Sequence, residues 1–301
     1  MRLESGRAIK MRRLHKFAVA CLALTLSGSA AAQFDFLNKA IDAAKSKMGP
    51  AGNLLDKAKP VIDSMGIDES KEIEIGNTFA ASLLGAKPLL NDPALHRYIN
   101  TLGRWLAMQT ERPDLPWAFG VLDDDGFNAF ATPGGNIFVT KGLLARMRSE
   151  SELAGVLSHE IAHVIRKHYL NAIQTNALAG GTADLIAENV KKGPAEFRSY
   201  FAGLFKDVYS KGLDKGDEYE ADRIGVVIAA RAGFDPYGLP GVLQTLQSQN
   251  PRDGGFTLLF ETHPTPTDRL DSLSKAMNGR FDSSNGSVGK SFSERSKEFS
   301  R

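Results

Sequence analysis

Three histidines lie close together in the segment SESELAGVLSHEIAHVIRKHYL, which spans residues 149–170. Two of them, His159 and His163, enclose a glutamate in the pattern His-Glu-x-x-His. Residues four apart project from the same face of an α-helix, so both imidazoles can bind one zinc ion. Glu160 lies about 100° around the helix from His159, which suits a general base acting on a water molecule at the metal. The pattern indicates a hydrolytic zinc site.

A catalytic zinc ion needs a third protein ligand, and His168 is the nearest candidate. The metzincin pattern requires Gly three residues after the second histidine and His three residues beyond that, where this chain has Arg166 and Tyr169. On a continuous helix, His168 would also lie about 180° from His159. We therefore predict that His168 is no ligand and is instead partly exposed or satisfied within the core.

A better third ligand lies downstream, in the segment GDEYEADRIG. Glu218 and Asp222 are spaced i, i+4, which places them on one face of a helix. If Glu218 binds zinc, Asp222 can accept the free N–H of a ligand histidine and thereby fix its tautomer. Glu220 is predicted to point away from that face into solvent. Alone, such a pair is a weak signal, since many exposed helices carry one.

Helices and a few short strands must position these residues. Ser149 and Glu152 form a capping box, which predicts a helix from there to about Ile173. Aromatic and β-branched residues predict two or three short strands over 117–144, with a type II turn at 132–135. A helical region from about 72 to 105 is interrupted at Pro88 and Pro93. Further helices are predicted over 217–232 and along an apolar stripe of Phe197, Tyr200, Phe201, Leu204, Phe205 and Val208, which is expected to be core rather than a lid or partner surface.

The N-terminal 32 residues have the pattern of a secretory signal peptide. A basic stretch precedes an apolar run of about ten residues, half of what a membrane span needs, and Ala30 to Ala32 precede the predicted cleavage site. Met11 is an alternative start. Cys21, the only cysteine, falls in this segment, so no disulfide is expected in the mature chain. The signal carries six Lys/Arg and one Glu, which turns the whole-chain charge of +2 into −3 and gives no indication of nucleic-acid binding.

We expect four parts: a signal peptide (1–32), an N-terminal helical segment (33–74), the main domain (75–278) and a disordered polar tail (279–301). No apolar run after Ala32 approaches the length of a transmembrane helix. A chain with 42% hydrophobic and 24% charged residues can bury one substantial core or two modest ones.

Four segments in order, NAFATPGGNIFV, ELAGVLSHEIAHV, EYEADRIG and HPTPTDR, carry a resemblance to a known family. The chain resembles the zinc metallopeptidases that include HtpX, the CAAX prenyl endopeptidases and BepA. The resemblance implies an α+β, predominantly helical zincin domain of the gluzincin type, with a small β-sheet beside the active-site helix. It also implies a single Zn²⁺ ion and a set of roles: His159, His163 and Glu218 as ligands, Glu160 as catalytic base, Asp222 as helix partner, and His263 and Arg269 on a loop near the site.

Two interpretations of His263 remain open at the level of sequence, besides a merely structural His-Pro turn. It can donate a hydrogen bond to the oxyanion of the reaction, or it can occupy the fourth zinc position and hold the site inactive until its loop moves. The family tends to place Arg three residues before the ligand Glu, where this chain has Lys215.

The function predicted from these residues is zinc-dependent endopeptidase activity on unfolded or misassembled envelope proteins in the periplasm. An open strand edge, at 136–140 or around Phe130, would hold an extended peptide. Outer-membrane assembly machinery is a possible partner. The alternative is a chaperone or assembly factor that binds clients in the same cleft and seldom cleaves them. A purely structural zinc site is disfavoured because such sites are usually closed and rich in cysteine.

Overall fold

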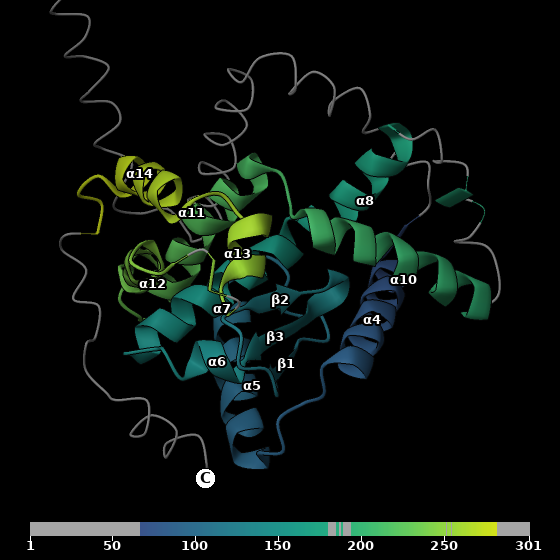
Figure 1. Cartoon of the computed structure of the whole chain (residues 1–301), viewed down its shortest axis with the longest axis horizontal. Helices are drawn as coiled ribbons and strands as arrows, with labels where there is room; N and C mark the ends of the chain where they lie inside the picture. Colours follow the sequence, from purple (N-terminus) through teal and green to yellow (C-terminus); the bar gives the residue numbers. More distant parts are fainter. Residues whose placement is uncertain are drawn as a thin grey trace, which may run out of the picture. The chain divides into compact units, whose positions relative to one another are not determined.

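The computed structural model describes residues 67–179, 185–186, 188, 194–250, 252–253 and 255–281. The predicted signal peptide with Cys21, the segment up to residue 66 and the tail after residue 281 lie outside these residues. The described part is predominantly helical with one small sheet, which confirms the predicted α+β class (Figure 1).

Two helices with acidic caps open the described part. Helix α4 (Glu69–Ala86) begins after Asp68, whose side chain accepts from the Lys71 amide, and the predicted boundary at 74/75 falls within this helix. Helix α5 (Pro93–Ala107) begins after Asp92, with Pro93 in its first turn. Proline is favoured there because that turn lacks intrahelical acceptors for its N–H groups. The predicted interruption between the two helices is confirmed.

Three short strands form the sheet, in the order β1-β3-β2. Strand β1 (Ala118–Leu122) runs parallel to β3 (Asn136–Thr140), and β2 (Ala129–Ala131) runs antiparallel to it. Because β3 is paired on both sides, the prediction that 136–140 offers an open edge is wrong. Within the described residues, β2 is an edge strand of this sheet, so the alternative around Phe130 remains.

The predicted type II turn connects β2 to β3 as the short helical turn η1 (Pro133–Gly135). Gly134 has φ 77° and ψ 1°, the values that this turn requires at its third residue. The turn also packs tightly on α4, since a Cβ on Gly134 would lie 2.6 Å from the Cα atom of Ile73. Only glycine meets both conditions.

The helix that carries the histidines is shorter than predicted. After α6 (Lys141–Leu144), helix α7 (Glu150–Ile165) begins at the expected cap, where Ser149 Oγ accepts from the Glu152 amide at 3.1 Å. It ends at Ile165 instead of Ile173, and α8 (His168–Ala179) begins after a turn in which Lys167 has φ 58°. Asn171 donates from Nδ2 to the carbonyl of Arg166 at 3.2 Å, which satisfies a group freed at the break.

Further helices follow in the described part: α10 (Pro194–Lys211), α11 (Lys215–Arg231), α12 (Gly238–Gln247), α13 (Thr257–Thr262) and α14 (Pro266–Met277). Helix α11 packs along α7, and α12 contacts both α7 and α14. The main core lies between α5, the sheet, α7, α11 and α12. In a second core, Phe201 and Val208 of the predicted stripe pack with Ile75 and Phe79 of α4 and with α8. This confirms the core interpretation for those two residues; the side chains of Phe197 and Phe205 lie outside the described set.

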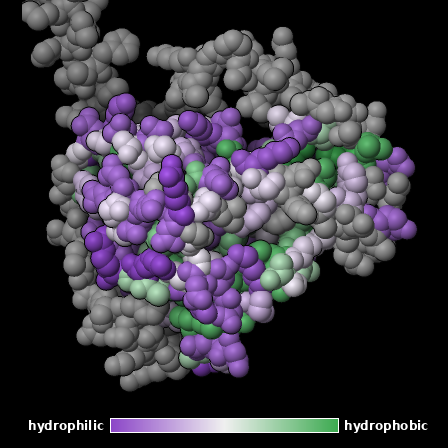
Figure 2. Space-filling view, viewed as in Figure 1, coloured by the Kyte–Doolittle hydropathy of each residue, from purple (hydrophilic) through white to green (hydrophobic). Residues whose placement is uncertain are grey.

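On the face shown in Figure 2, hydrophilic residues cover most of the surface over α11, α12 and α14, and hydrophobic residues are more frequent near α4 and α10. Among the described residues, none of the helices combines the length and the apolar character that crossing a membrane requires.

Candidate metal centre

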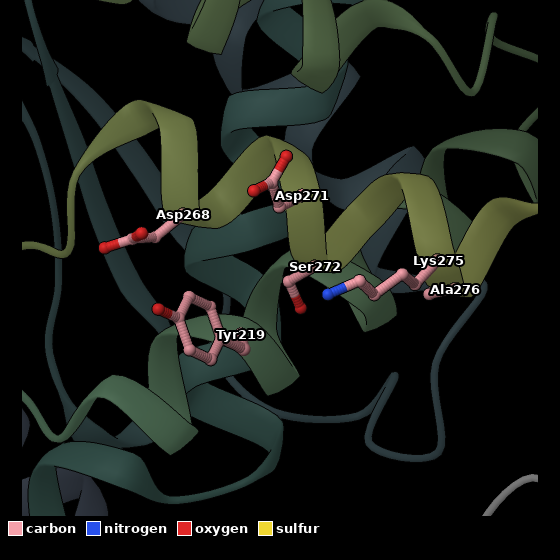
Figure 3. Close-up of a pocket in the computed structure, with 6 residues that line it drawn as sticks. All are labelled: Tyr219, Asp268, Asp271, Ser272, Lys275 and Ala276. Carbon is pink, nitrogen blue, oxygen red and sulfur yellow. The ribbon is translucent and has the colours of Figure 1, made fainter.

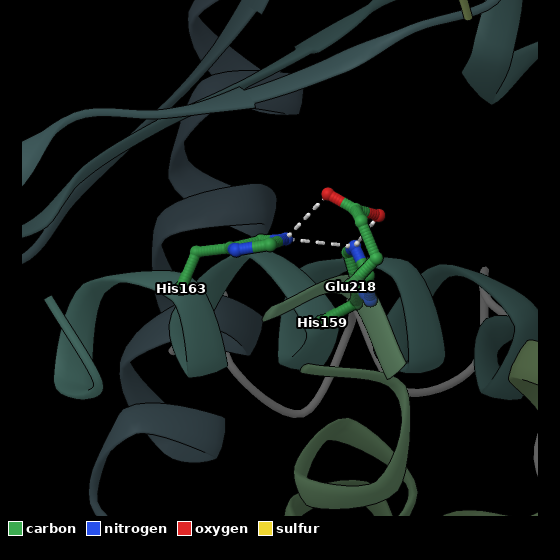
Figure 4. Close-up of side chains that lie close together, drawn as sticks. All are labelled: His159, His163 and Glu218. Atoms are coloured by element: carbon green, nitrogen blue, oxygen red, sulfur yellow. Dashed lines mark hydrogen bonds and ion pairs between the residues drawn. The ribbon is translucent and has the colours of Figure 1, made fainter. Parts of the chain in front are cut away.

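Helices α7 and α11 bring three predicted ligands together. His159 and His163 project from α7, and Glu218 approaches from the first turn of α11 (Figure 4). The helices approach closely at Gly225, where a Cβ would lie 2.9 Å from the His159 amide nitrogen. One donor atom from each of the three ligands lies within 4.8 Å of the others, and all three side chains are buried.

The donor geometry fits a small divalent cation. His159 Nε2 and His163 Nε2 are 3.0 Å apart, and they lie 3.6 Å and 3.5 Å from the nearest carboxylate oxygen of Glu218. Ligands about 2.05 Å from a tetrahedral zinc ion are separated by about 3.3 Å, which lies within this range. Glu218 Oε2 is buried without a hydrogen-bond partner among the described residues. Two imidazoles and one carboxylate are also a common ligand set for catalytic zinc.

The electrostatics of the three ligands also favour a cation. Burial raises the pKa of Glu218 well above its ordinary value, with Asp222 and Glu160 adding to the effect against the charge of Arg269. Burial, reinforced by the neighbouring imidazoles, lowers the pKa of His163 well below its ordinary value, and burial also lowers that of His159. Neutral imidazoles offer the lone pairs that a metal needs, and a bound cation would stabilise the buried carboxylate.

Asp222 and Arg269 support His159 from behind. Asp222 Oδ1 lies 3.0 Å from His159 Nδ1, and Arg269 holds both carboxylate oxygens through contacts of 2.5 Å and 2.9 Å. Burial alone would raise the pKa of Asp222, but the charge and hydrogen bonds of Arg269 outweigh it and hold that pKa far below its ordinary value. Asp222 is thus a carboxylate that accepts from Nδ1 and leaves Nε2 free to face the other ligands.

Glu160 lines a largely apolar cavity together with His159 and Arg269. Its Oε2 atom is buried and has no hydrogen-bond partner among the described residues. Burial raises the pKa of Glu160 to about 8, although the charge of Arg269 acts in the opposite direction. The cavity is also lined by Asn128 and Ala129, at the beginning of β2, and by apolar side chains that include Phe127, Val156, Leu239, Val242, Leu243 and Leu246.

His263 directly follows α13 and approaches the ligand Glu218. Its Nε2 atom is 3.7 Å from Glu218 Oε2, and its Nδ1 atom is 3.2 Å from the carbonyl oxygen of Leu259. Nδ1 also lies 2.9 Å from Thr262 Oγ1, which can donate or accept. The tautomer with the proton on Nδ1 satisfies the Leu259 carbonyl, which can only accept, and leaves the lone pair on Nε2. Burial and the charge of Arg269 lower the pKa of His263 to about 3, which keeps the ring neutral.

His168 lies in one of the two surroundings predicted for it, whereas Glu220 does not. His168 is buried and Glu220 is 4% exposed, so the expectation that Glu220 points into solvent is wrong. Arg166 Nη2 lies 2.9 Å from Glu220 Oε1, an ion pair that draws the side chain inward. The break after Ile165 invalidates the continuous-helix argument about His168, whose Nδ1 atom lies 3.0 Å from His163 Nδ1. His168 remains outside the group formed by His159, His163 and Glu218.

The sequence contains only a weak signal of this arrangement. Neither Arg166 nor Lys167 is a typical helix breaker, and the break depends on tertiary contacts of both side chains, to Glu220 and to Glu72. Asn171 is the one residue whose type suits a helix junction, because its amide can bond a freed carbonyl.

A second, open pocket lies between α11 and α14 and is separate from this centre (Figure 3). Tyr219 lines it from α11, and Asp268, Asp271, Ser272, Lys275 and Ala276 line it from α14. None of the candidate ligands contributes to its lining.

Known proteins resemble this chain over most of its described length. Residues 93–277 match the model of peptidase family M48. The β-barrel assembly-enhancing protease of Yersinia pestis is 33% identical over 238 residues, which cover 76% of this chain and 48% of that protein. The protein of the same name from Escherichia coli K12 is 33% identical over 66% of this chain and 42% of its own length. The mitochondrial metalloendopeptidase OMA1 of Schizosaccharomyces pombe is 28% identical over 58% of this chain and 51% of its own length. The chain thus spans about half the length of the curated relatives it matches.

Proposed function

The chain belongs to peptidase family M48, whose relatives above include metalloendopeptidases, and we propose that it is a zinc-dependent endopeptidase of the gluzincin type. In this proposal His159, His163 and Glu218 bind one Zn²⁺ ion. The observation that carries it is the meeting of these three buried donors beside Glu160, a buried carboxylate with an unpartnered oxygen.

Each residue has a task in amide hydrolysis. A zinc ion bound here would supply Lewis-acid polarisation of the scissile carbonyl and make water easier to deprotonate. Glu160 accepts the proton from the attacking water and later delivers it to the leaving amine. The raised pKa of Glu160 suits a group that must both take up and release a proton. Asp222 and Arg269 hold His159 in the tautomer that offers Nε2.

The edge strand β2 and the apolar cavity suggest how a peptide is held. An extended peptide can pair with β2 through its backbone, while the cavity beside Glu160 takes an apolar side chain next to the scissile bond. Unfolded segments readily present both an extended backbone and exposed apolar side chains. This supports unfolded or misassembled polypeptide as the substrate class.

The cellular setting rests on the sequence and on the relatives. A secretory signal over residues 1–32 would direct the remaining chain to the periplasm, and two relatives are named for enhancing β-barrel assembly. We propose that the protein acts on envelope proteins there, in contact with outer-membrane assembly machinery. The parts 33–74, 75–278 and 279–301 remain the proposed division of the mature chain.

The tautomer of His263 favours one of its two interpretations. In the tautomer that donates from Nδ1 to the Leu259 carbonyl, Nε2 has a lone pair for a metal and no proton for an oxyanion. This supports an inhibitory fourth ligand. It also favours the second candidate function, a chaperone or assembly factor that binds clients in the same cleft while its proteolysis is held off.

The decisive assay combines zinc content with cleavage of an unfolded outer-membrane protein. Glu160→Gln should retain one zinc per chain and lower kcat/KM at least about 100-fold, because a general base is lost. His263→Ala should raise the cleavage rate if His263 inhibits the site. If neither the wild type nor His263→Ala cleaved the substrate, the chaperone function would be favoured. Full activity of Glu160→Gln would refute the peptidase mechanism.

A further inference from the structure

His163 has an outer partner that the ligand set does not include. Its Nε2 atom faces His159 and Glu218, and its Nδ1 atom lies 3.0 Å from His168 Nδ1. A histidine that binds a metal through Nε2 must carry its proton on Nδ1. His163 Nδ1 is therefore the donor in this contact and His168 Nδ1 the acceptor, so His168 carries its own proton on Nε2.

The second nitrogen of His168 faces carboxylates. His168 Nε2 is 3.4 Å from Glu220 Oε2 and 3.7 Å from Asp217 Oδ1. These distances exceed those of an ordinary N–H···O hydrogen bond, so the negative charges orient the N–H mainly by electrostatic attraction. Arg166 fixes Glu220 through a contact of 2.9 Å, and both His168 and Glu220 are buried. Burial strengthens this attraction because little water screens it.

We propose that His168 is a positioning residue: it accepts the Nδ1–H of His163, fixes the tautomer and ring orientation of that ligand, and is itself oriented by Glu220. This inference rests on the proposed metal site. It gives His163 a counterpart to the Asp222–Arg269 support of His159, but through a neutral imidazole. The two rings of His163 and His168 meet edge to face, with 74° between their planes, which suits an in-plane N–H···N bond.

The turn after α7 makes this contact possible. On a continuous helix, residues 163 and 168 would lie about 140° apart and could not share a hydrogen bond. Lys167 adopts the left-handed conformation, φ 58°, and its Nζ atom lies 2.9 Å from Glu72 on α4. Few residues other than glycine adopt this conformation without cost. The turn thus brings His168 back toward α7, within hydrogen-bond distance of His163.

A second metal ion is the competing explanation, because donor atoms of His168, Asp217 and Glu220 lie within 4.8 Å of one another. The guanidinium of Arg166 argues against it, since it already sits on Glu220 and would repel a second cation. Measuring the zinc content separates the two explanations. The proposed contacts from His163 through His168 to Glu220 (the relay) predict one zinc per chain, and a second metal site predicts two.

Two variants of nearly equal size test the relay. In His168→Asn, the side-chain oxygen can lie near the position of Nδ1 and accept from His163; in His168→Leu, no acceptor remains. Zinc affinity of the full chain, measured by competition with a chromophoric chelator, should fall about 10- to 100-fold in His168→Leu and stay within about threefold in His168→Asn. Both variants lose the ring, so a packing defect would affect them alike.

Other results would overturn the relay. Equal affinities in wild type and both variants, or equal losses in both variants, would remove the role of the acceptor. Two zinc ions in the wild type, with one lost in both variants, would show a second metal site instead. Long-range ¹H–¹⁵N spectra of the zinc-loaded protein should show His168 protonated on Nε2, and protonation on Nδ1 would contradict it. A wild type that binds no zinc would refute the proposed function and the relay together, a pattern distinct from all of these.

Discussion

The two candidate histidine ligands are held by different kinds of surroundings. His159 has a direct carboxylate partner, Asp222, which is locked by a bidentate Arg269 from α14. His163 has a neutral imidazole partner, His168, and the nearest charges lie one residue further out, at Glu220 and Arg166. The first arrangement joins α7, α11 and α14, whereas the inner contact of the second is made within six residues of the chain.

This difference has an electrostatic consequence. A carboxylate beside His159 raises the basicity of the ligand, and Arg269 keeps that carboxylate ionised in a buried place. A neutral partner beside His163 orients the ring without adding another negative charge. With Glu160 and Glu218 already buried nearby, a further carboxylate would increase the repulsion among anions. The two supports, Asp222 with Arg269 for His159 and His168 with Glu220 for His163, orient both rings while limiting the number of buried charges next to the ligands.

Asp222→Asn should have the largest effect, because it leaves the buried Arg269 charge without its partner. We expect a loss of folding stability of about 3 to 5 kcal/mol, measured by urea denaturation. His168→Leu removes a neutral side chain and leaves Glu220 paired with Arg166, so it should cost about 1 to 2 kcal/mol in the same assay. Equal losses of folding stability in the two variants would contradict the expected difference between a charged partner of His159 and a neutral partner of His163.

A double variant provides the control for Asp222→Asn. In Asp222→Asn with Arg269→Met, the unpaired charge is gone, so most of the lost stability should return. Zinc affinity should remain low in both, since His159 no longer has its carboxylate partner. Stability that does not recover would mean that packing, and not the buried charge, dominates at this position.

Gly225→Ala tests the approach of α11 to α7 and should have an intermediate effect. The added Cβ would lie 2.9 Å and 3.0 Å from backbone atoms of His159, so α11 must shift and carry Asp222 with it. We expect a loss of about 1 to 3 kcal/mol of folding stability and zinc affinity lowered at least about tenfold. Gly203→Ala on α10 is the matched control.

Gly203 has open space around the position of a Cβ, so alanine there should leave zinc affinity unchanged and stabilise the helix by about 0.5 to 1 kcal/mol. The result at Gly225 also sharpens the comparison. Asp222 contacts His159 directly from α11, whereas Glu220 of α11 reaches His163 only through His168, so the imidazole ¹⁵N signals of His163 should change less than those of His159. Equal changes at both histidines would indicate that both supports depend on the packing of α11.

Much of this architecture follows from local sequence. The cap at Ser149, the turn at 132–135 and the helix break around Pro88 and Pro93 are each set by residues whose conformational preferences are strong. The His-Glu-x-x-His spacing places two donors on one face by helix geometry alone. For these features the interactions that decide the structure lie within a few residues, so a single sequence contains them.

The remaining features depend on contacts between distant segments. In the turn after α7, Lys167 adopts a left-handed conformation although lysine is a good helix former. Glu220 binds the Arg166 side chain and Glu72 binds the Lys167 side chain, and these contacts hold the turn. Glu220 is buried for the same reason. The central place of β3 also depends on strand pairing, since a run of β-branched residues does not reveal how many neighbours a strand has. Such errors occur where tertiary contacts override local preference.

Glu72→Gln should have a smaller effect than Asp222→Asn, because its partners Arg112 and Lys167 are partly exposed, and it tests the anchor of the turn before His168. Glu72 is fully buried and accepts from Arg112 at 2.8 Å and 3.0 Å, with Lys167 Nζ at 2.9 Å. We expect a loss of about 1 to 2 kcal/mol at pH 7, measured by urea denaturation with a chelator in every sample. The chelator removes the separate pH dependence of metal binding.

The pH dependence gives this prediction its sign. Burial alone would raise the pKa of Glu72, but the hydrogen bonds and charges of Arg112 and Lys167 outweigh it and lower that pKa below its ordinary value of 4.5. The ionised carboxylate therefore stabilises the fold above about pH 4.5, and this contribution is lost as the pH falls through the lower pKa of the folded state. The stabilities of wild type and Glu72→Gln should differ at pH 7 and converge in acid. If the two stabilities instead changed in parallel with pH, the Glu72 charge would not hold the turn before His168. The support of His163 would then depend only on residues close to it in the sequence.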